Sequence, residues 1–339
     1  MSASLEPTPG NALLQNALLQ IDDLQVYFSV RKGFLGTQTV KAVDGVSLRL
    51  HRGEVVAVVG ESGSGKTTLG RAALGLVKPS GGHVYFEGKD INTFGDRERK
   101  AYRRRAQAIF QDPFATIDPY MTIAESVGEP LLIHGMGNEA ERRDRVLQAL
   151  REVRLTPEAE IGERFPHLLS GGQRQRAGIA RALVVQPAFI MADEPVSMVD
   201  ASSRAELLYL LRELRDHFGI AFLYITHDIA TARHFAQRIV VMYLGRIVES
   251  GPADRVVDNP LHPYTQALIA AVPEPDPANR LHERAVLQGE PPDPSHAPAG
   301  CAFHPRCPRF IAGKCEVAVP LLIEAEPGHF VACVLYQGQ

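Results

Sequence analysis

The stretch "EVVAVVGESGSGKTT", residues 54–68, decides the fold of this chain. Its first six residues are mostly apolar and β-branched, which predicts a buried strand, and the next nine match the pattern G-x-x-x-x-G-K-[ST]. This order predicts a strand, a glycine-rich loop and the start of a helix. The N–H groups of such a loop and the positive end of the helix can surround a phosphate group.

The side chains of this loop suit a nucleotide. The Lys66 ammonium can place its charge on the β and γ phosphates, and the Thr67 hydroxyl can coordinate Mg²⁺. A glycine-rich turn formed by chance is the alternative, but the complete pattern directly after a strand argues against it. We expect ATP with Mg²⁺ to contact Gly60, Ser62, Gly63, Ser64, Gly65, Lys66, Thr67 and Thr68.

A second acidic segment, "AFIMADEP" at residues 188–195, is predicted to form a neighbouring parallel strand. Asp193 then falls at the carboxyl end of the strand, where open α/β sheets bind ligands. There Asp193 can reach Mg²⁺, while Glu194 can orient and deprotonate a water molecule. Two carboxylates at a solvated strand end would mean little without the phosphate-binding loop.

A third segment, "HLLSGGQRQRAGIARAL" at residues 167–183, places Ser170, Gly171 and Gly172 at the start of a basic helix, followed by Gln173. It predicts a second helix N-terminus suited to an anion. Together, the three segments resemble the ATP-binding subunit of an ABC transporter over residues 20–255. The resemblance implies an α/β P-loop fold with a mixed sheet core, an antiparallel β subdomain and a helical subdomain inserted at about residues 112–165.

The resemblance implies roles for further residues. Phe28 is the preferred position for an aromatic ring that stacks on adenine, with Tyr27 as the alternative. Gln111 in "IFQDP" matches the Q-loop glutamine that senses Mg²⁺ and the γ phosphate. "SMVD" at 197–200 matches the D-loop, with Asp200 retained, and "YITHD" places His227 as the switch histidine that holds the γ phosphate and the attacking water.

In this family, a complete ATP site forms only when two chains face each other, with the loop of one opposed to the Ser170–Gly172 turn of the other. The chain contains one copy of each segment and no internal repeat. The partner is therefore a second ABC ATPase subunit, either a related paralogue or an identical copy. The family also implies two membrane permeases and, indirectly, an extracellular substrate-binding protein.

The remaining sequence indicates the subclass. "NPLHPYTQALIAAVP" at 259–273 resembles a tail segment of oligopeptide and dipeptide importers. We expect a flexible N-terminus at 1–19, the ATP-binding domain at 20–255, an extension and proline-rich linker at 256–300 and a separate cysteine module at 301–339. An importer for nickel or oligosaccharides, or a soluble ABC ATPase that acts as a switch, remains open as an alternative.

All four cysteines, at 301, 307, 315 and 333, lie in this last module with the spacing C-x5-C-x7-C-x17-C. A disulfide framework is not expected in a reducing compartment, and the tight cysteine pair usual in structural zinc sites is absent. Four thiolates match the ligand count of a [4Fe–4S] cluster, and peptide-importer ATPases carry a similar cysteine motif that binds one. We expect Cys301, Cys307, Cys315 and Cys333 to be its ligands, with zinc as the alternative.

The composition fits a globular ATPase. The chain has 339 residues, 45% hydrophobic and 22% charged, with a net charge of −3, so a nucleic-acid partner gains no support. The basic run at 97–105 reads as a solvated helix face. The longest apolar run, at 219–226, suits a buried strand and is too short to span a bilayer, and no Lys or Arg precedes Arg31 as a signal peptide would require. We therefore expect the chain at the cytoplasmic face of the membrane.

Overall fold

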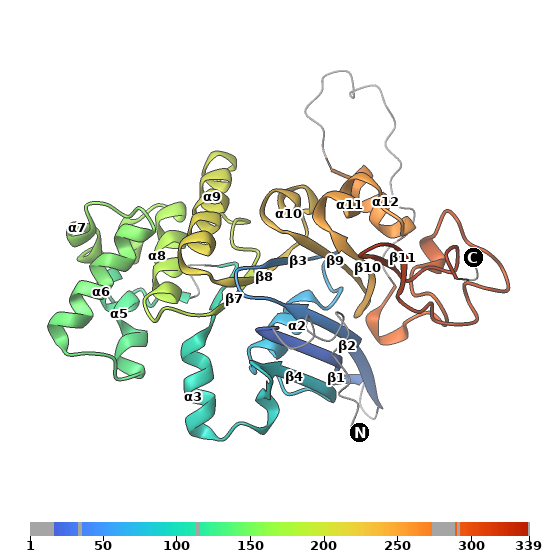
Figure 1. The fold of residues 1–339 in the computed structure, drawn as a ribbon, viewed down its shortest axis with the longest axis horizontal. Coiled ribbons are helices and arrows are strands. Elements are labelled where there is room, and N and C mark those ends of the chain that lie inside the picture. Colours follow the sequence, from blue (N-terminus) through green and yellow to red (C-terminus); the bar gives the residue numbers. More distant parts are fainter. Residues whose placement is uncertain (1–16, 33–35, 113–115, 273–288, 290–291, 338–339) are drawn as a thin grey trace, which may run out of the picture.

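A computed structural model of the chain describes residues 17–32, 36–112, 116–272, 289 and 292–337. Its centre is a mixed eight-stranded sheet in the order β11-β12-β10-β9-β3-β8-β7-β6 (Figure 1). The five strands from β9 to β6 are parallel, and β10, β12 and β11 continue the sheet antiparallel. The strands are β3 Val55–Val59, β6 Ala106–Ile109, β7 Phe189–Asp193, β8 Ala221–Thr226, β9 Arg238–Tyr243, β10 Arg246–Pro252, β11 Ile323–Glu326 and β12 His329–Val331.

Both faces of this sheet are covered, which explains why its central strands are continuously apolar. In β3, Val55, Ala57 and Val59 belong to one buried cluster, and the alternate Val56 and Val58 belong to the other. The predicted strands at 54–59, 188–193 and 219–226 are confirmed as β3, β7 and β8.

A four-stranded antiparallel sheet, in the order β2-β1-β4-β5, packs beside the large sheet (Figure 1). Its strands are β1 Leu19–Lys32, β2 Gly36–Leu50, β4 Gly81–Phe86 and β5 Lys89–Asp90. Leu18 and Leu19 are buried in this part of the core, so the core includes two residues before the boundary predicted at residue 20. Residues 1–16 of the predicted flexible terminus lie outside the described chain.

Most helices lie along the large sheet. Helices α5, α6 and α7 form a separate green group at one end of the molecule (Figure 1). The bounds of the helices are α2 Lys66–Ala73, α3 Asp96–Arg105, α5 Ile123–Ile133, α6 Glu139–Glu152, α7 Glu158–Gly162, α8 Gly171–Leu183, α9 Ala201–Phe218, α10 Ile229–Phe235, α11 Ala253–Asp258 and α12 Pro263–Ala270, with short 3₁₀ turns η1 Ile91–Thr93, η2 Pro166–Leu168, η4 Pro294–His296 and η5 His304–Arg306. Of the helices in the described ranges, none is both long and apolar enough to cross a membrane.

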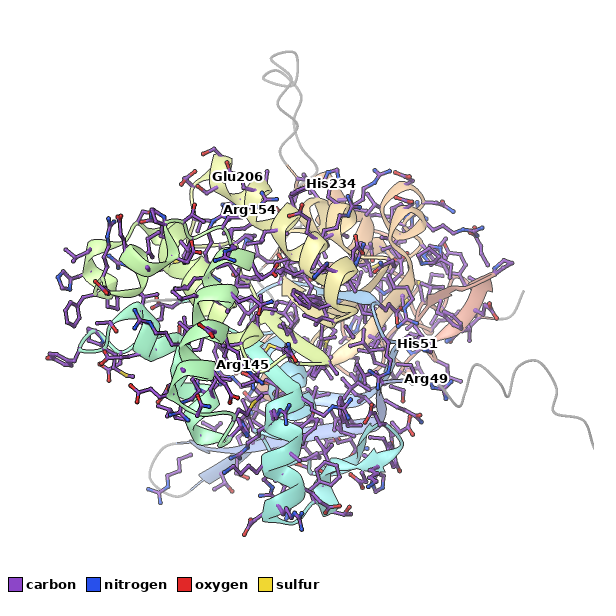
Figure 2. The ribbon with its side chains drawn as sticks, turned by 60° about the vertical axis from the view of Figure 1, so that its left-hand side comes forward. Arg49, His51, Arg145, Arg154, Glu206 and His234 are labelled. Carbon is purple, nitrogen blue, oxygen red and sulfur yellow. The ribbon has the colours of Figure 1, made fainter. Side chains whose placement is uncertain are left out.

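Helices α5 and α6 pack on α8, which in turn packs on β6 of the large sheet. Arg154, just after α6, forms an ion pair with Glu213 and lies over the ring of Tyr209, both on α9. Arg176 on α8 pairs with Glu206 on α9 at 3.0 Å. Arg154 and Glu206, which take part in these two ion pairs, are labelled in Figure 2. This arrangement has the form that the family resemblance implies for a helical subdomain.

The C-terminal cysteine segment is not separate from the core, as the sequence had led us to expect. Strand β12 pairs antiparallel with β10, so this segment extends the large sheet. His329 and Glu249, both fully buried, join the two strands at 2.7 Å. The expectation of a tethered, separate module is therefore wrong, because backbone pairing and a buried polar contact attach it to the sheet. Residues 273–288, 290 and 291 of the predicted linker lie outside the described chain.

Candidate nucleotide site

The glycine-rich loop connects β3 to α2 and requires glycine where its backbone passes close to other segments. Gly65, the residue before α2, has φ 101°, and a Cβ atom there would lie 2.1 Å from the Ala42 carbonyl oxygen. A side chain at this position would therefore clash and strain the backbone. Ser62 and Gly63 are exposed at the loop, whereas Ser64 is buried, so the loop presents backbone to solvent where a phosphate would bind.

Lys66 is buried, and its ammonium folds back over the loop. Its Nζ donates to the carbonyl oxygens of Gly60 at 2.7 Å and Glu61 at 2.8 Å. Burial lowers the pKa of Lys66, while neighbouring carboxylates oppose that shift. The side chain thus holds a desolvated positive charge next to the loop, as a phosphate-binding lysine requires.

Thr67 and Asp193 meet below this loop. The Thr67 Oγ1 hydroxyl donates to Asp193 Oδ1 at 3.2 Å, and Asp193 is the last residue of β7, as predicted. Burial raises the pKa of Asp193, because a carboxylate that loses water is less stable in its charged form. Two oxygen ligands at one buried point suit a hard divalent cation such as Mg²⁺.

Glu194 is held between two polar side chains from other strand ends. Its Oε2 accepts from Gln111 Nε2 at 3.1 Å, and its Oε1 lies 2.8 Å from His227 Nδ1. The Glu194 backbone has φ 46°, in the left-handed region that side chains other than glycine rarely adopt. The structure therefore brings together Gln111, Glu194 and His227, which lie far apart in the sequence.

Ser170 caps α8 in the way its sequence predicts. Its Oγ accepts from Gln173 N–H at 3.3 Å, and Gln173 Oε1 accepts from Ser170 N–H at 3.0 Å. In the described parts of the chain, no hydrogen bond connects this turn to the phosphate-binding loop of the same molecule. The turn is therefore available for a ligand outside the site formed by Lys66, Thr67 and Asp193.

Asp200 begins α9 close to the same turn. Its carboxylate accepts from the Ser203 N–H at 2.9 Å and from the hydroxyls of Ser202 and Ser203. These hydrogen bonds lower the pKa of Asp200 to about 2. A Cβ atom at Gly172 would lie 3.8 Å from Ser203 Oγ, which shows how closely the two helix starts approach each other.

Phe28 and Tyr27 differ in what they contact. Tyr27 donates its hydroxyl to Asp44 at 2.5 Å, and Lys41 Nζ lies 5.4 Å from its ring centre. Phe28 is 42% exposed on β1 and is available to stack on a base. The geometry favours Phe28 over Tyr27, and the adenine contact stays a prediction.

Sequence reasoning missed two contacts to the loop, of which the ion pair with Arg306 spans the longer distance in the sequence. Arg306, in the cysteine segment, forms a two-pronged ion pair with Glu61, and the Tyr264 hydroxyl accepts from Glu61 N–H at 2.8 Å. Arg306 lies 245 residues after Glu61. Because neither residue belongs to a pattern that links the two segments, no signal in a single sequence could have found this contact.

The four cysteines gather at the C-terminal end of the fold, and all are free thiols. Burial, and then the other three cysteines, raise the pKa of Cys301 to about 11. Burial also raises the pKa of Cys307 and Cys333. Within the described ranges, no group of three or more His, Cys, Asp or Glu side chains is placed to hold a metal ion. The arrangement of the four cysteines therefore does not show the predicted [4Fe–4S] cluster.

Two protein families match consecutive parts of the chain. Residues 43–197 match the family described as "ABC transporter", and residues 248–315 match "Oligopeptide/dipeptide transporter, C-terminal region". The first match spans the phosphate-binding loop, Gln111, the Ser170 turn and Glu194. The second includes Cys301, Cys307 and Cys315.

Similar proteins have related names and structures. The chain is 46% identical to a peptide import ATP-binding protein of Brucella ovis, over 95% of this chain and 99% of that protein. It is 44% identical to an oligopeptide transport ATP-binding protein of Bacillus subtilis, over 95% of this chain and 98% of that one. A dimeric ATP-binding cassette bound to ADP and phosphate aligns with a TM-score of 0.61 and 31% identity, over 69% of this chain and 98% of that one.

Proposed function

Because the chain belongs to the ATP-binding proteins of ABC transporters, in the oligopeptide and dipeptide group, we propose that it hydrolyses ATP to drive peptide import through membrane permeases. The observation that carries the catalytic part is the position of Glu194. This carboxylate follows Asp193 directly and contacts Gln111 and His227, so it stands at the strand ends beside the phosphate-binding loop.

The residues support a defined division of work in hydrolysis. Lys66 and the loop N–H groups bind the β and γ phosphates. Thr67 and Asp193 would hold Mg²⁺, which neutralises charge on the phosphates when bound. Glu194 accepts a proton from the attacking water, while His227 and Gln111 orient that water and the γ phosphate. The water oxygen bonds to the γ phosphorus as the bond to the bridging oxygen breaks, so that ADP and inorganic phosphate are released.

A second ABC ATPase subunit completes each site in this proposal. The Ser170–Gly172 turn presents free helix N–H groups that favour negative charge. Opposed to the loop of a partner chain, it would contact the γ phosphate and hold the two subunits together until hydrolysis removes that phosphate. The dimer of the similar cassette bound to ADP and phosphate supports this arrangement. The partner is a related paralogue or a second copy of this chain.

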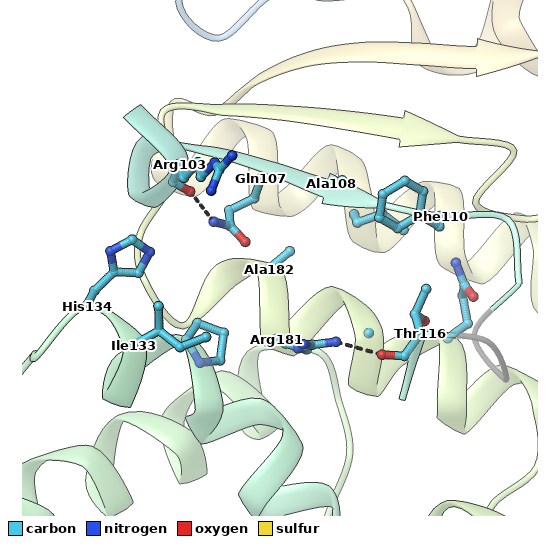
Figure 3. A pocket seen from close by; sticks show the side chains of 13 residues that line it. Arg103, Gln107, Ala108, Phe110, Thr116, Ile133, His134, Arg181 and Ala182 are labelled. Carbon is cyan, nitrogen blue, oxygen red and sulfur yellow. Dashed lines mark hydrogen bonds between the residues drawn. The ribbon is translucent and has the colours of Figure 1, made fainter. Parts of the chain in front are cut away.

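A cavity next to the Q-loop is the proposed contact for the permeases. It has a volume of about 440 Å³ and lies between β6, α5 and α8 (Figure 3). Arg181, which lines it, donates to the Thr116 carbonyl at 2.6 Å (Figure 3). Ile133, half exposed at its edge, adds apolar surface. A permease segment that docks there would keep the chain at the cytoplasmic face of the membrane.

The cysteines support a [4Fe–4S] cluster as a further part of the proposal. The four thiols lie within electrostatic reach of one another, and Ile311 N–H donates to Cys315 Sγ at 3.4 Å, as happens around cluster sulfurs. Cys301, Cys307, Cys315 and Cys333 would hold the cluster, whose role in an ATPase would be structural or sensory. An anaerobic preparation should contain about four iron and four sulfide per chain. Zinc without iron or sulfide would reject the cluster.

Transport can be tested directly. The chain should be reconstituted in liposomes with the two permeases, the binding protein and, where the partner is not a second copy of this chain, the second ATPase subunit of the proposed importer. We expect labelled di- and oligopeptides to accumulate only with ATP and to stimulate ATP hydrolysis. Uptake of nickel or oligosaccharide in place of peptide would overturn the peptide assignment. ATP hydrolysis without any association with permeases would instead favour a soluble switch.

A further inference from the structure

An ion pair joins the cysteine segment to the phosphate-binding loop. Arg306 Nη1 donates to Glu61 Oε2 at 2.9 Å, and Nη2 donates to Glu61 Oε1 at 3.2 Å. The Arg306 side chain is only 7% exposed, and that of Glu61 25% exposed. A two-pronged pair of this kind fixes both the position and the orientation of the carboxylate.

Glu61 is the second residue of the loop and is linked to its lysine. The carbonyl oxygen of Glu61 accepts from Lys66 Nζ at 2.8 Å, and its N–H donates to the hydroxyl of Tyr264 on α12. The side chain, the carbonyl and the N–H of one loop residue are therefore all engaged. Two of these three contacts come from the part of the chain that follows β10.

Glu61 would be unfavourable for ATP if it were unpaired. Its carboxylate acts on the charge of Lys66, so it lies within electrostatic reach of the group that binds the phosphates. An uncompensated negative charge there would repel the triphosphate and compete for Lys66. The Arg306 guanidinium neutralises this charge through the two-pronged pair.

The cysteine segment sets the position of Arg306. Arg306 ends η5, between Cys301 and Cys307, and the Cys301 N–H donates to the Cys315 carbonyl at 2.7 Å. Gly300, with φ 68°, permits this close approach, since a Cβ there would lie 2.3 Å from the same carbonyl oxygen. The guanidinium thus projects from a turn whose shape depends on how the thiol-bearing loops pack.

An aromatic cluster fills the space between this turn and the loop. Tyr243, Tyr264 and Phe303 pack with ring centres 4.7 to 5.4 Å apart, and Tyr243 Oη accepts from Arg306 Nη1 at 3.4 Å. Phe303 is buried in the main hydrophobic cluster of the protein. Tightly packed rings leave little freedom for Arg306 to move without moving its neighbours.

From these contacts we propose that Arg306 is a positioning residue for ATP, through which the cysteine segment controls the nucleotide affinity of the phosphate-binding loop. The inference rests on the proposed ATPase function and adds an internal regulator to it. Any change that displaces the turn between Cys301 and Cys307 would leave Glu61 unpaired beside the triphosphate. The ATP affinity would then fall, while the groups that act on water would stay in place.

The test compares Arg306→Gln, Glu61→Gln and the double variant in the full-length chain. Titration with a fluorescent ATP analogue should show a Kd for R306Q raised by roughly 5- to 50-fold. KM for ATP should rise in parallel, with kcat within about twofold of the wild type. The double variant E61Q/R306Q should recover most of the affinity, because it removes the unpaired carboxylate. Arg309→Gln, an exposed arginine of the same segment, should leave Kd and KM unchanged.

Each outcome decides between the possible roles. Equal Kd values for the wild type and R306Q would overturn the inference alone, whereas a wild-type chain that does not bind ATP would overturn the proposed function as well. A double variant as weak as R306Q would reduce Arg306 to a general structural role and also overturn the inference. If R306Q does not fold, Arg306→Met takes its place: it keeps an apolar side chain among the packed rings but removes the charge, and an unchanged Kd would overturn the inference.

Discussion

Glu194 shows what single residues contribute to this site. Its carboxylate lies within hydrogen-bonding distance of Gln111 and His227, and its backbone adopts a conformation that costs about 1–3 kcal/mol. Such a cost is retained where a side chain must point in a fixed direction. Asp193, one residue earlier, points toward Thr67 instead. The end of β7 thus places one carboxylate beside Thr67 and the next one between Gln111 and His227.

Replacing Glu194 by Gln should remove the general base and keep the shape of the site. We expect kcat for ATP hydrolysis to fall by roughly 10²- to 10⁴-fold, because a positioned base contributes about that much. ATP binding and ATP-dependent association should persist, since neither requires the proton transfer. Steady-state hydrolysis and size-exclusion chromatography with ATP measure the two effects. Glu160→Gln, on α7, is the matched control, and normal turnover in E194Q would contradict the assignment.

Replacing Asp193 by Asn should raise the thermal stability of the chain without nucleotide and lower its ATP hydrolysis. Burial raises the pKa of Asp193 from its ordinary 3.8, so the folded chain without nucleotide is destabilised once this group ionises. That cost is absent below the ordinary pKa and develops as the pH rises through the raised one. We expect D193N to melt roughly 1–4 °C higher than the wild type at neutral pH, with no difference in acid.

The same variant should lose Mg²⁺-dependent hydrolysis, because an amide is a weaker ligand for a divalent cation than a carboxylate. Differential scanning fluorimetry between pH 4 and 8 and hydrolysis at increasing Mg²⁺ give both readings. Asp144→Asn on α6 serves as the control. A lower melting temperature for D193N at neutral pH would show that the carboxylate stabilises the empty site, contrary to its raised pKa.

At the scale of elements, the residues at the N-terminus of a helix determine whether its first N–H groups can bind an anion. Helices α5 and α8 both begin with a capping box, formed by Thr122 with Glu125 and by Ser170 with Gln173. The caps are alike in hydrogen bonding, but α8 begins with Gly171 and Gly172, which leave its first N–H groups accessible. Only α8 is proposed to meet the nucleotide of a partner chain.

This likeness gives a matched pair of variants. Ser170→Ala and Thr122→Ala should each destabilise the fold by about 1 kcal/mol, because each removes one capping hydrogen bond. Only S170A should also slow ATP hydrolysis, by roughly tenfold or more, while its single-chain ATP Kd stays the same. Urea unfolding and hydrolysis assays measure the two quantities. Equal activity losses in both variants would trace the effect of S170A to stability and remove the turn from the site.

The elements that carry the site could be predicted, and the tail attachment could not. Strands β3, β7 and β8 are continuous apolar runs, and parallel neighbours end at one edge, so Lys66, Asp193 and His227 follow from local patterns. Strand β12 has three residues, His329–Val331, and its sequence does not indicate which strand it pairs with. The Arg306–Glu61 pair likewise joins residues that lie 245 positions apart in the sequence. Long-range contacts of short segments leave no periodic signal in a single sequence.

At the scale of the whole molecule, the C-terminal segment joins the ATPase core at several places, and two of these contacts bear on the nucleotide site. Glu249 on β10 accepts from His329 Nε2 and from the N–H groups of Leu261 and His262, all buried. The second place is the Arg306–Glu61 pair at the phosphate-binding loop. The first attachment holds the segment to the sheet, and the second connects it to the nucleotide. Weakening the Glu249–His329 contact should therefore also weaken the Arg306–Glu61 pair.

His329→Gln tests this connection across the molecule. The amide keeps a polar group opposite Glu249 but fits its buried carboxylate less well, so we expect a loss of roughly 2–4 kcal/mol in unfolding free energy. Hydrogen exchange should increase in residues 301–337 and, through Arg306, in the loop at 60–66. The Kd for ATP should rise in the same direction as in R306Q. His217→Gln, on the exposed face of α9, should change none of these values, and faster exchange confined to the C-terminal segment would show that the two attachments are independent.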